Sequence, residues 1–164
     1  GKLIGIQNRN LDYKKQTNAN RSPTKSHHSP PCGGEAEAAL PRFRFPCGSR
    51  CSIYNMPVIA MLRPEEPLYI TEGCSDCWAM LSAGHKAVAI PSATLLSQAD
   101  KDMLLSLSDR LGTAFRMYPD SDAPGERLFL QLKETLPSLE RHQLPPGCKD
   151  FSDYYVSAIK AKST

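Results

Sequence analysis

The chain has 164 residues, of which 40% are hydrophobic and 23% charged, and its formal net charge is +3. These values are ordinary for a soluble globular protein. No apolar run approaches the roughly 18 residues that a membrane-spanning helix needs, and the N-terminal "GKLIGIQNRN" has no signal-peptide core. We therefore expect a cytoplasmic protein without a membrane partner, whose six cysteines are mostly reduced.

The net charge is unevenly distributed along the chain. Residues 1–50 carry nine Lys and Arg against three acids, which gives +6 and leaves −3 for the other 114 residues. A basic part beside an acidic part indicates a polyanionic partner at one end and bound cations at the other. A solvated basic surface explains the same charge equally well.

The first third of the chain shows little periodicity. Residues 10–40 are rich in Asn, Ser, Thr, Lys, Pro and Gly, which predicts a long flexible loop. The flanking pieces "KLIGIQ" and "RFRFP" are short and strand-like. We expect residues 1–66 to form a small basic subdomain made mostly of β-structure and loop.

From Pro67 onwards, strand and helix patterns alternate. The expected strands are residues 68–71, 86–90 and 114–118, with a further short strand around "RHQL". Helices are expected at residues 75–84, 97–112, from 124 onwards, and 149–161, and Pro137 should bend or shorten the third of them. The leucine stripes of these helices and Trp78 are assigned to the core. The alternation predicts a parallel sheet flanked by helices in a domain spanning residues 67–164.

Acidic residues follow two of the predicted strands. Glu72 and Gly73 come directly after the first strand, and Asp120 and Asp122 follow the third across Pro119. Because the carboxyl ends of parallel strands meet at one edge of a sheet, these acids should lie close together. Three more acids stand at the starts of helices: Asp76, Asp150 and Asp153.

Crowded carboxylates repel one another, and hard divalent cations remove that cost. The pattern therefore favours an Mg²⁺ site in which Gly125 lets the backbone turn tightly. A simpler role is also open for Asp122, which could cap the helix that begins near Pro124. An EF-hand loop is excluded because Pro124 and Gln131 occupy positions where that loop needs oxygen ligands. A haloacid dehalogenase motif is disfavoured by the same proline.

Four motifs together resemble the Toprim domain, in the branch of the bacterial DnaG-type primases. They are "PLYITEGCSDCWAMLSAG", "AVAIPSATLL", "MYPDSDAPG" and "GCKDFSDYY". The first contains an E-G-x-x-D pattern from Glu72 to Asp76, the third a D-x-D-x-x-G, and the last a Lys-Asp-x-x-Asp. Their order and spacing match the family over roughly residues 67–156, and "GKLIGIQNRN" and "GSRCSIYNMP" resemble primase-core segments upstream.

The resemblance implies a primase-like nucleotidyltransferase that makes primers on single-stranded DNA from nucleoside triphosphates. Its catalytic residues would be Glu72, Asp120 and Asp122, which would hold two Mg²⁺ or Mn²⁺ ions with support from Asp76 and Asp150. Lys149 would add positive charge near a phosphate. The basic subdomain would contact the template through four arginines: Arg9, Arg42, Arg44 and Arg50.

The chain also departs from the primase pattern. The usual Gly-Thr-Ala turn is replaced by Ser92-Ala93-Thr94, and no zinc module or helicase-binding tail is recognisable. We expect a fragment of a larger protein, with any helicase contact made by regions outside this chain. Zinc binding by Cys74 and Cys77 or by Cys47 and Cys51 is disfavoured. A Toprim nuclease and a non-catalytic nucleic-acid-binding module remain alternative functions.

Overall fold

The computed structural model describes residues 8–9, 43–44, 52–91 and 96–162. The chain divides into two compact units, residues 1–51 and 52–164. In the first unit, strands β1 (Asn8–Arg9) and β2 (Phe43–Arg44) form a short antiparallel pair. The expected loop of residues 10–40 lies outside the described residues. The predicted domain boundary after residue 66 stays a prediction.

The second unit is built on a four-stranded parallel sheet in the order β4-β3-β5-β6. Its strands are β3 (Leu68–Glu72), β4 (Lys86–Ile90), β5 (Phe115–Met117) and β6 (Glu140–Arg141). Its helices are η1 (Met56–Met61), α2 (Cys74–Ser82), α3 (Gln98–Leu111), α4 (Ala123–Thr135) and α5 (Phe151–Lys162). The prediction of a parallel sheet flanked by helices is confirmed.

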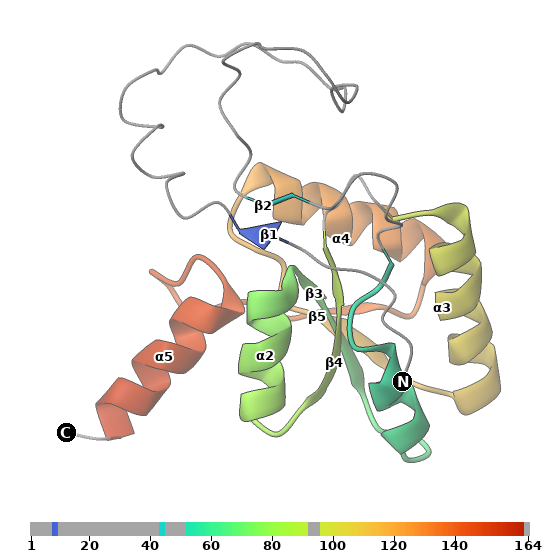
Figure 1. Ribbon diagram of the computed structural model, residues 1–164, viewed down its shortest axis with the longest axis horizontal. Helices are drawn as coiled ribbons and strands as arrows, with labels where there is room; N and C mark the ends of the chain where they lie inside the picture. The colour runs from blue at the N-terminus through green and yellow to red at the C-terminus, as the bar shows by residue number, and fades with distance from the viewer. Residues whose placement is uncertain (1–7, 10–42, 45–51, 92–95, 163–164) are drawn as a thin grey trace, which may run out of the picture. The chain divides into compact units, whose positions relative to one another are not determined.

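The helices cover both faces of this sheet (Figure 1). Alternate residues of β3 point to opposite faces, so that Leu68 and Ile70 join the core beneath α3 and α4, whereas Tyr69 joins the core beneath α2 and α5. On β4 the larger Val88 and Ile90 point to the α3 and α4 side. The sheet is therefore the middle of three layers. Its edge strand β4 is joined to Tyr54 by an antiparallel bridge at Ala89.

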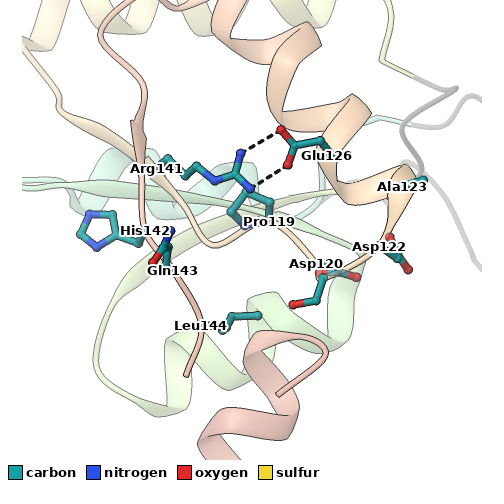
Figure 2. A pocket seen from close by; sticks show the side chains of 10 residues that line it. Pro119, Asp120, Asp122, Ala123, Glu126, Arg141, His142, Gln143 and Leu144 are labelled. Carbon is teal, nitrogen blue, oxygen red and sulfur yellow. Dashed lines mark hydrogen bonds and ion pairs between the residues drawn. The ribbon is translucent and has the colours of Figure 1, made fainter. Parts of the chain in front are cut away.

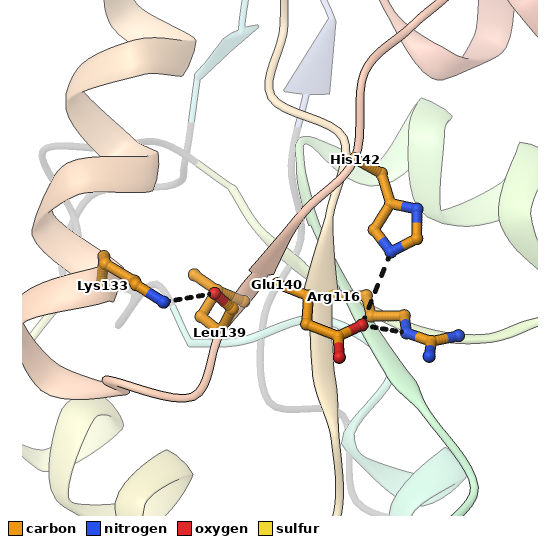
Figure 3. A network of polar contacts seen from close by, with 5 residues as sticks. All are labelled: Arg116, Lys133, Leu139, Glu140 and His142. Carbon is orange, nitrogen blue, oxygen red and sulfur yellow. Dashed lines mark hydrogen bonds and ion pairs between the residues drawn. The ribbon is translucent and has the colours of Figure 1, made fainter.

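Helix boundaries follow the local signals in the sequence. Pro124 lies in the first turn of α4, where its missing N–H costs nothing, and the helix ends at Thr135, two residues before Pro137. The turn from α4 to β6 is held by Lys133, which donates hydrogen bonds to the carbonyl oxygens of Pro137 (2.7 Å) and Leu139 (2.8 Å) (Figure 3). The expected shortening of this helix by Pro137 is confirmed.

The leucine stripes lie in the core as predicted, but the prediction for Trp78 is wrong. Leu104, Leu128 and Leu132 are fully buried, whereas the Trp78 side chain is 56% exposed. Its indole N–H donates a 2.9 Å hydrogen bond to the hydroxyl of Tyr54. The exposed face of α2 carries this residue, and Cys77 and Met80 fill the core beneath that helix.

The order of the strands sets where a ligand can bind. From β3 the chain passes through α2 to β4 on one side, and from β5 it passes through α4 to β6 on the other. Successive strands are therefore added in opposite directions from the neighbouring strands β3 and β5, which makes this pair the topological switch point of the sheet. Open α/β sheets bind ligands beyond the carboxyl ends of such a strand pair.

Two glycines shape the backbone at this edge of the sheet, each for a different reason. Gly73 has φ 83°, a left-handed conformation that other residues rarely adopt, and it directly precedes α2. Gly125 is different, because a Cβ there would lie 2.6 Å from the Asp120 carbonyl oxygen and 2.8 Å from the Asp120 nitrogen. Gly125 is therefore needed for the space it leaves, not for the tight turn that the sequence suggested.

Replacing Gly125 with alanine should destabilise the protein. The added methyl meets backbone atoms that cannot rotate away, so we expect a loss of about 1–3 kcal/mol in the free energy of unfolding. An ordinary exposed helix position such as Ser106 should tolerate alanine with a slight gain. Urea denaturation of the two variants measures both values, and a Gly125→Ala variant as stable as the parent would contradict this packing.

Candidate metal centre

Three carboxylates from separate parts of the chain meet at the carboxyl end of the sheet. Asp76 lies in the first turn of α2, Asp120 follows β5, and Asp150 directly precedes α5. One oxygen of each lies within 4.8 Å of the others. Two oxygens bound to one Mg²⁺ at about 2.1 Å lie at most about 4.2 Å apart, so carboxylates at this spacing need only a small side-chain movement to share one hard divalent cation.

Hydrogen bonds fix the orientation of these acids. Asp76 is buried and accepts two hydrogen bonds from Ser152, from the backbone N–H at 2.8 Å and from the hydroxyl at 2.7 Å. Asp150 accepts the backbone N–H of Asp153 at 2.9 Å, as a helix cap does. Because the two bonds to Asp76 come from Ser152 in the first turn of α5, they hold that helix against the start of α2.

The loop that carries Asp120 and Asp122 is tied to the approach to α5. The Ser121 N–H donates to the Lys149 carbonyl oxygen at 2.8 Å, and the Ser121 hydroxyl donates to the Cys148 carbonyl oxygen at 3.2 Å. These two hydrogen bonds therefore hold the D-x-D and Lys-Asp motifs together, although the motifs are nearly 30 residues apart in the sequence.

Asp122 occupies the capping position that the sequence left open. Its side chain is the N-cap of α4 and accepts the Gly125 N–H at 3.0 Å. The other carboxylate oxygen lies 3.8 Å from Nζ of Lys149. Asp122 thus caps α4 with one oxygen and faces the Lys149 ammonium group with the other. Lys149 therefore lies beside an acid of the predicted metal set.

Glu72 ends strand β3 with one oxygen unsatisfied. Its Oε2 is buried and has no hydrogen-bond partner among the residues that the structure describes. Burial raises the pKa of Glu72, and the negative charges of Asp122 and Asp76 raise it further. An orphaned buried carboxylate oxygen beside other acids fits a site that is completed by a cation.

Asp120 is the most strongly perturbed acid of the group. Burial, and after it the nearby charges of Asp76 and Glu72, together raise its pKa to about 8. Burial also raises the pKa of Asp76, against the opposing effect of its two hydrogen bonds from Ser152. Five acids thus repel one another at this edge, and a donor set made entirely of carboxylate oxygens suits Mg²⁺ or Mn²⁺.

The structure therefore brings one carboxylate oxygen each of Asp76, Asp120 and Asp150 within 4.8 Å of one another. Glu72 and Asp122 lie close enough for their charges to raise the pKa of Asp120. Their service as metal ligands or catalytic residues stays a prediction. No sequence pattern indicates Ser152 as a partner of Asp76, because the two are 76 residues apart. Only the fold places α5 beside α2.

The remaining predicted site residues belong to the first unit or lie outside the described residues. Arg9 and Arg44 lie on β1 and β2 in the other unit, and Arg42, Arg50 and the Ser92-Ala93-Thr94 turn lie outside the described residues. The template-binding role of these arginines stays a prediction. Cys77 is buried against the Ala87 carbonyl oxygen, and burial raises the pKa of its thiol to about 12, so at neutral pH it is not a thiolate.

No family model matches this sequence, and no curated protein matches it. Among solved structures, the chain is similar to a small TOPRIM domain protein from Bacillus stearothermophilus. The two share 19% sequence identity and a TM-score of 0.44, over 62% of this chain and 87% of the other. In the described part of the chain, no helix is long and apolar enough to cross a membrane.

The raised pKa of Asp120 predicts a measurable pH dependence of stability. Between about pH 4 and pH 8 the folded protein holds a proton that the unfolded chain has released, so without metal this group's contribution to stability should fall as pH rises. An Asp120→Asn variant cannot ionise. At pH 8.5 it should melt about 3 °C higher than the metal-free parent, after allowance for partial solvent screening.

Differential scanning fluorimetry across pH 5–9 in chelator measures this difference. The matched control is Asp109→Asn, which removes an exposed carboxylate from α3. Added Mg²⁺ should raise the melting temperature of the parent and of the control, but not that of Asp120→Asn. If the stability of the metal-free parent does not fall as the pH rises above 5, the inferred repulsion among the carboxylates around Asp120 is contradicted.

Proposed function

We propose that this chain is a Toprim-type domain that performs primase-like nucleotidyl transfer on single-stranded DNA. The observation that carries the proposal is the convergence of Asp76, Asp120 and Asp150 within 4.8 Å beside Glu72. These four acids come from three of the four motifs on which the resemblance rests. Two of them, Asp76 and Asp150, stand in the E-G-x-x-D and Lys-Asp-x-x-Asp patterns that are typical of its primase branch.

Each acid has a distinct task in this proposal. Glu72, which has a buried oxygen at the end of β3, and Asp120, which follows the neighbouring strand β5, would hold the cations. Asp76 and Asp150 would complete the oxygen set from the helix side. When bound, Mg²⁺ or Mn²⁺ supplies charge neutralisation for the attacking and leaving oxygens of phosphoryl transfer. Ser152 keeps Asp76 oriented, and the proton on Asp120 must leave before a cation binds.

The Toprim nuclease uses the same kind of carboxylate site, so the acids alone do not separate the two enzymes. The basic N-terminal unit, with its +6 charge over residues 1–50, favours a protein that holds a long polyanion while it works. A template that stays bound during several additions needs such contacts.

A direct assay separates the proposed functions. The chain is incubated with Mn²⁺, labelled nucleoside triphosphates and a single-stranded template, and in parallel with end-labelled DNA alone. Primase-like transfer predicts labelled products longer than a dinucleotide in the first reaction and intact DNA in the second. Shortened DNA in the second reaction would instead identify a nuclease, and DNA binding without either product a non-catalytic module.

Substitution of the acids should remove activity without removing DNA binding. Asp120→Asn and Glu72→Gln are each expected to lower product formation at least 100-fold, because a lost carboxylate weakens the charge neutralisation of the transition state. The control Asp109→Asn should retain the parent rate. Equal activity of Asp120→Asn and the parent would show that the cluster is not the active site.

The basic unit should act through phosphate contacts. Replacing Arg42, Arg44 or Arg50 singly with alanine should weaken single-stranded DNA binding across all sequences and flatten its salt dependence by about one unit of slope. Metal affinity should stay unchanged. Fluorescence anisotropy at several salt concentrations measures the slope, and parent-like binding by all three variants would remove the template role from this unit.

A further inference from the structure

A pocket of about 380 Å³ adjoins the acid cluster, and apart from the D-x-D loop no residue that lines it has a role assigned above. One wall is the D-x-D loop with Asp120 and Asp122, and the other is the segment Arg141, His142 and Gln143 that leaves strand β6. Figure 2 shows Arg141 reaching across from β6 to Glu126 on the first turn of α4. The pair therefore bridges the two walls of the pocket.

We propose that this pocket binds the phosphate group of a nucleotide or nucleic-acid strand, and that Arg141 is the side chain that holds it. The inference rests on the proposed function, because it places the phosphate next to the acids that would hold the cations. Mg²⁺ bound by few carboxylates commonly takes phosphate oxygens of the substrate as further ligands. A phosphate bound in this pocket lies beside Asp120, which lines it directly.

Arg141 is the only side chain with a permanent positive charge among the described residues that line the pocket. Its two terminal nitrogens donate to the two carboxylate oxygens of Glu126, at 2.9 and 2.7 Å. A phosphate presents the same pair of acceptor oxygens with more negative charge. The guanidinium is thus already arranged for bidentate binding of an oxyanion.

The ion pair with Glu126 can open at little cost. Both side chains are more than two-fifths exposed, and surface ion pairs of this kind contribute little to stability. The Arg141 guanidinium also lies 5.0 Å from the centre of the Phe129 ring, which gives the arginine a second support when it changes partner. Glu126 therefore acts as a stand-in acceptor that a phosphate displaces.

The chain offers a matched control on the neighbouring strand. Arg116 on β5 also makes an ion pair, here through its Nε, which lies 2.7 Å from Oε2 of Glu140 (Figure 3), and it does not line the pocket. Arg116→Gln and Arg141→Gln remove the same charge and break one exposed ion pair each. A general electrostatic effect would weaken phosphate binding equally in the two variants, whereas the pocket predicts a difference.

The test measures binding of a fluorescent nucleoside triphosphate to the full chain in the presence of Mn²⁺. Arg141→Gln should weaken binding about tenfold, the value of one charge-assisted hydrogen-bond pair, and Arg116→Gln should stay within twofold of the parent. Glu126→Gln should tighten binding about threefold, because the neutral amide competes less well for Arg141. Equal losses in both arginine variants, or no loss in Arg141→Gln, overturn the proposal.

Two further arms identify the source of the phosphate and separate this inference from the function on which it rests. The same variants are titrated with a 5′-phosphorylated oligonucleotide, and the ligand that loses affinity in Arg141→Gln alone is the occupant. Mn²⁺ binding is followed separately by electron paramagnetic resonance without nucleotide. Normal Mn²⁺ binding with no Arg141 effect overturns only the phosphate site, whereas a parent that binds no Mn²⁺ overturns the metal centre and the phosphate site together.

Discussion

Mutual repulsion of carboxylates is the constraint around which the second unit is built. Asp76, Asp120 and Asp150 each have an oxygen within 4.8 Å of the others, and such crowding costs free energy unless charge is removed or balanced. The protein meets this cost locally with backbone N–H groups: Ser152 serves Asp76, and Asp153 serves Asp150. Among the described residues no such donor serves Asp120, and burial together with the neighbouring acids raises its pKa to about 8.

Three helices begin at this cluster, and their placement answers the same constraint. Asp76, Asp122 and Asp150 stand at the starts of α2, α4 and α5, where the unsatisfied N–H groups carry partial positive charge. The parallel sheet makes this possible, because each helix that follows a strand starts at the carboxyl edge. The fold and the site therefore depend on each other: the acids stabilise the N-termini of the helices, and these N-termini hold the acids in position.

The sequence predicted the features that depend on local pattern and chain direction. Alternating strands and helices placed Glu72 and Asp120 at one edge, since parallel strands end together. It could not predict pairs that only tertiary packing creates, such as Asp76 with Ser152 or Glu126 with Arg141. The turn pattern pointed to Gly125 for a tight turn, whereas the structure needs a glycine there because a Cβ would lie 2.6 Å from the Asp120 carbonyl oxygen.

Glu126 shows how the two halves of the site depend on each other. It lies in the first turn of α4, so the helix N-terminus stabilises its charge even when Arg141 turns away. That same turn is capped by Asp122, and it packs against Asp120 through Gly125. A cation bound by the acids would add positive charge to one wall of the pocket and favour an anion there. Metal and phosphate should therefore bind cooperatively, because each supplies the charge that the other wall lacks.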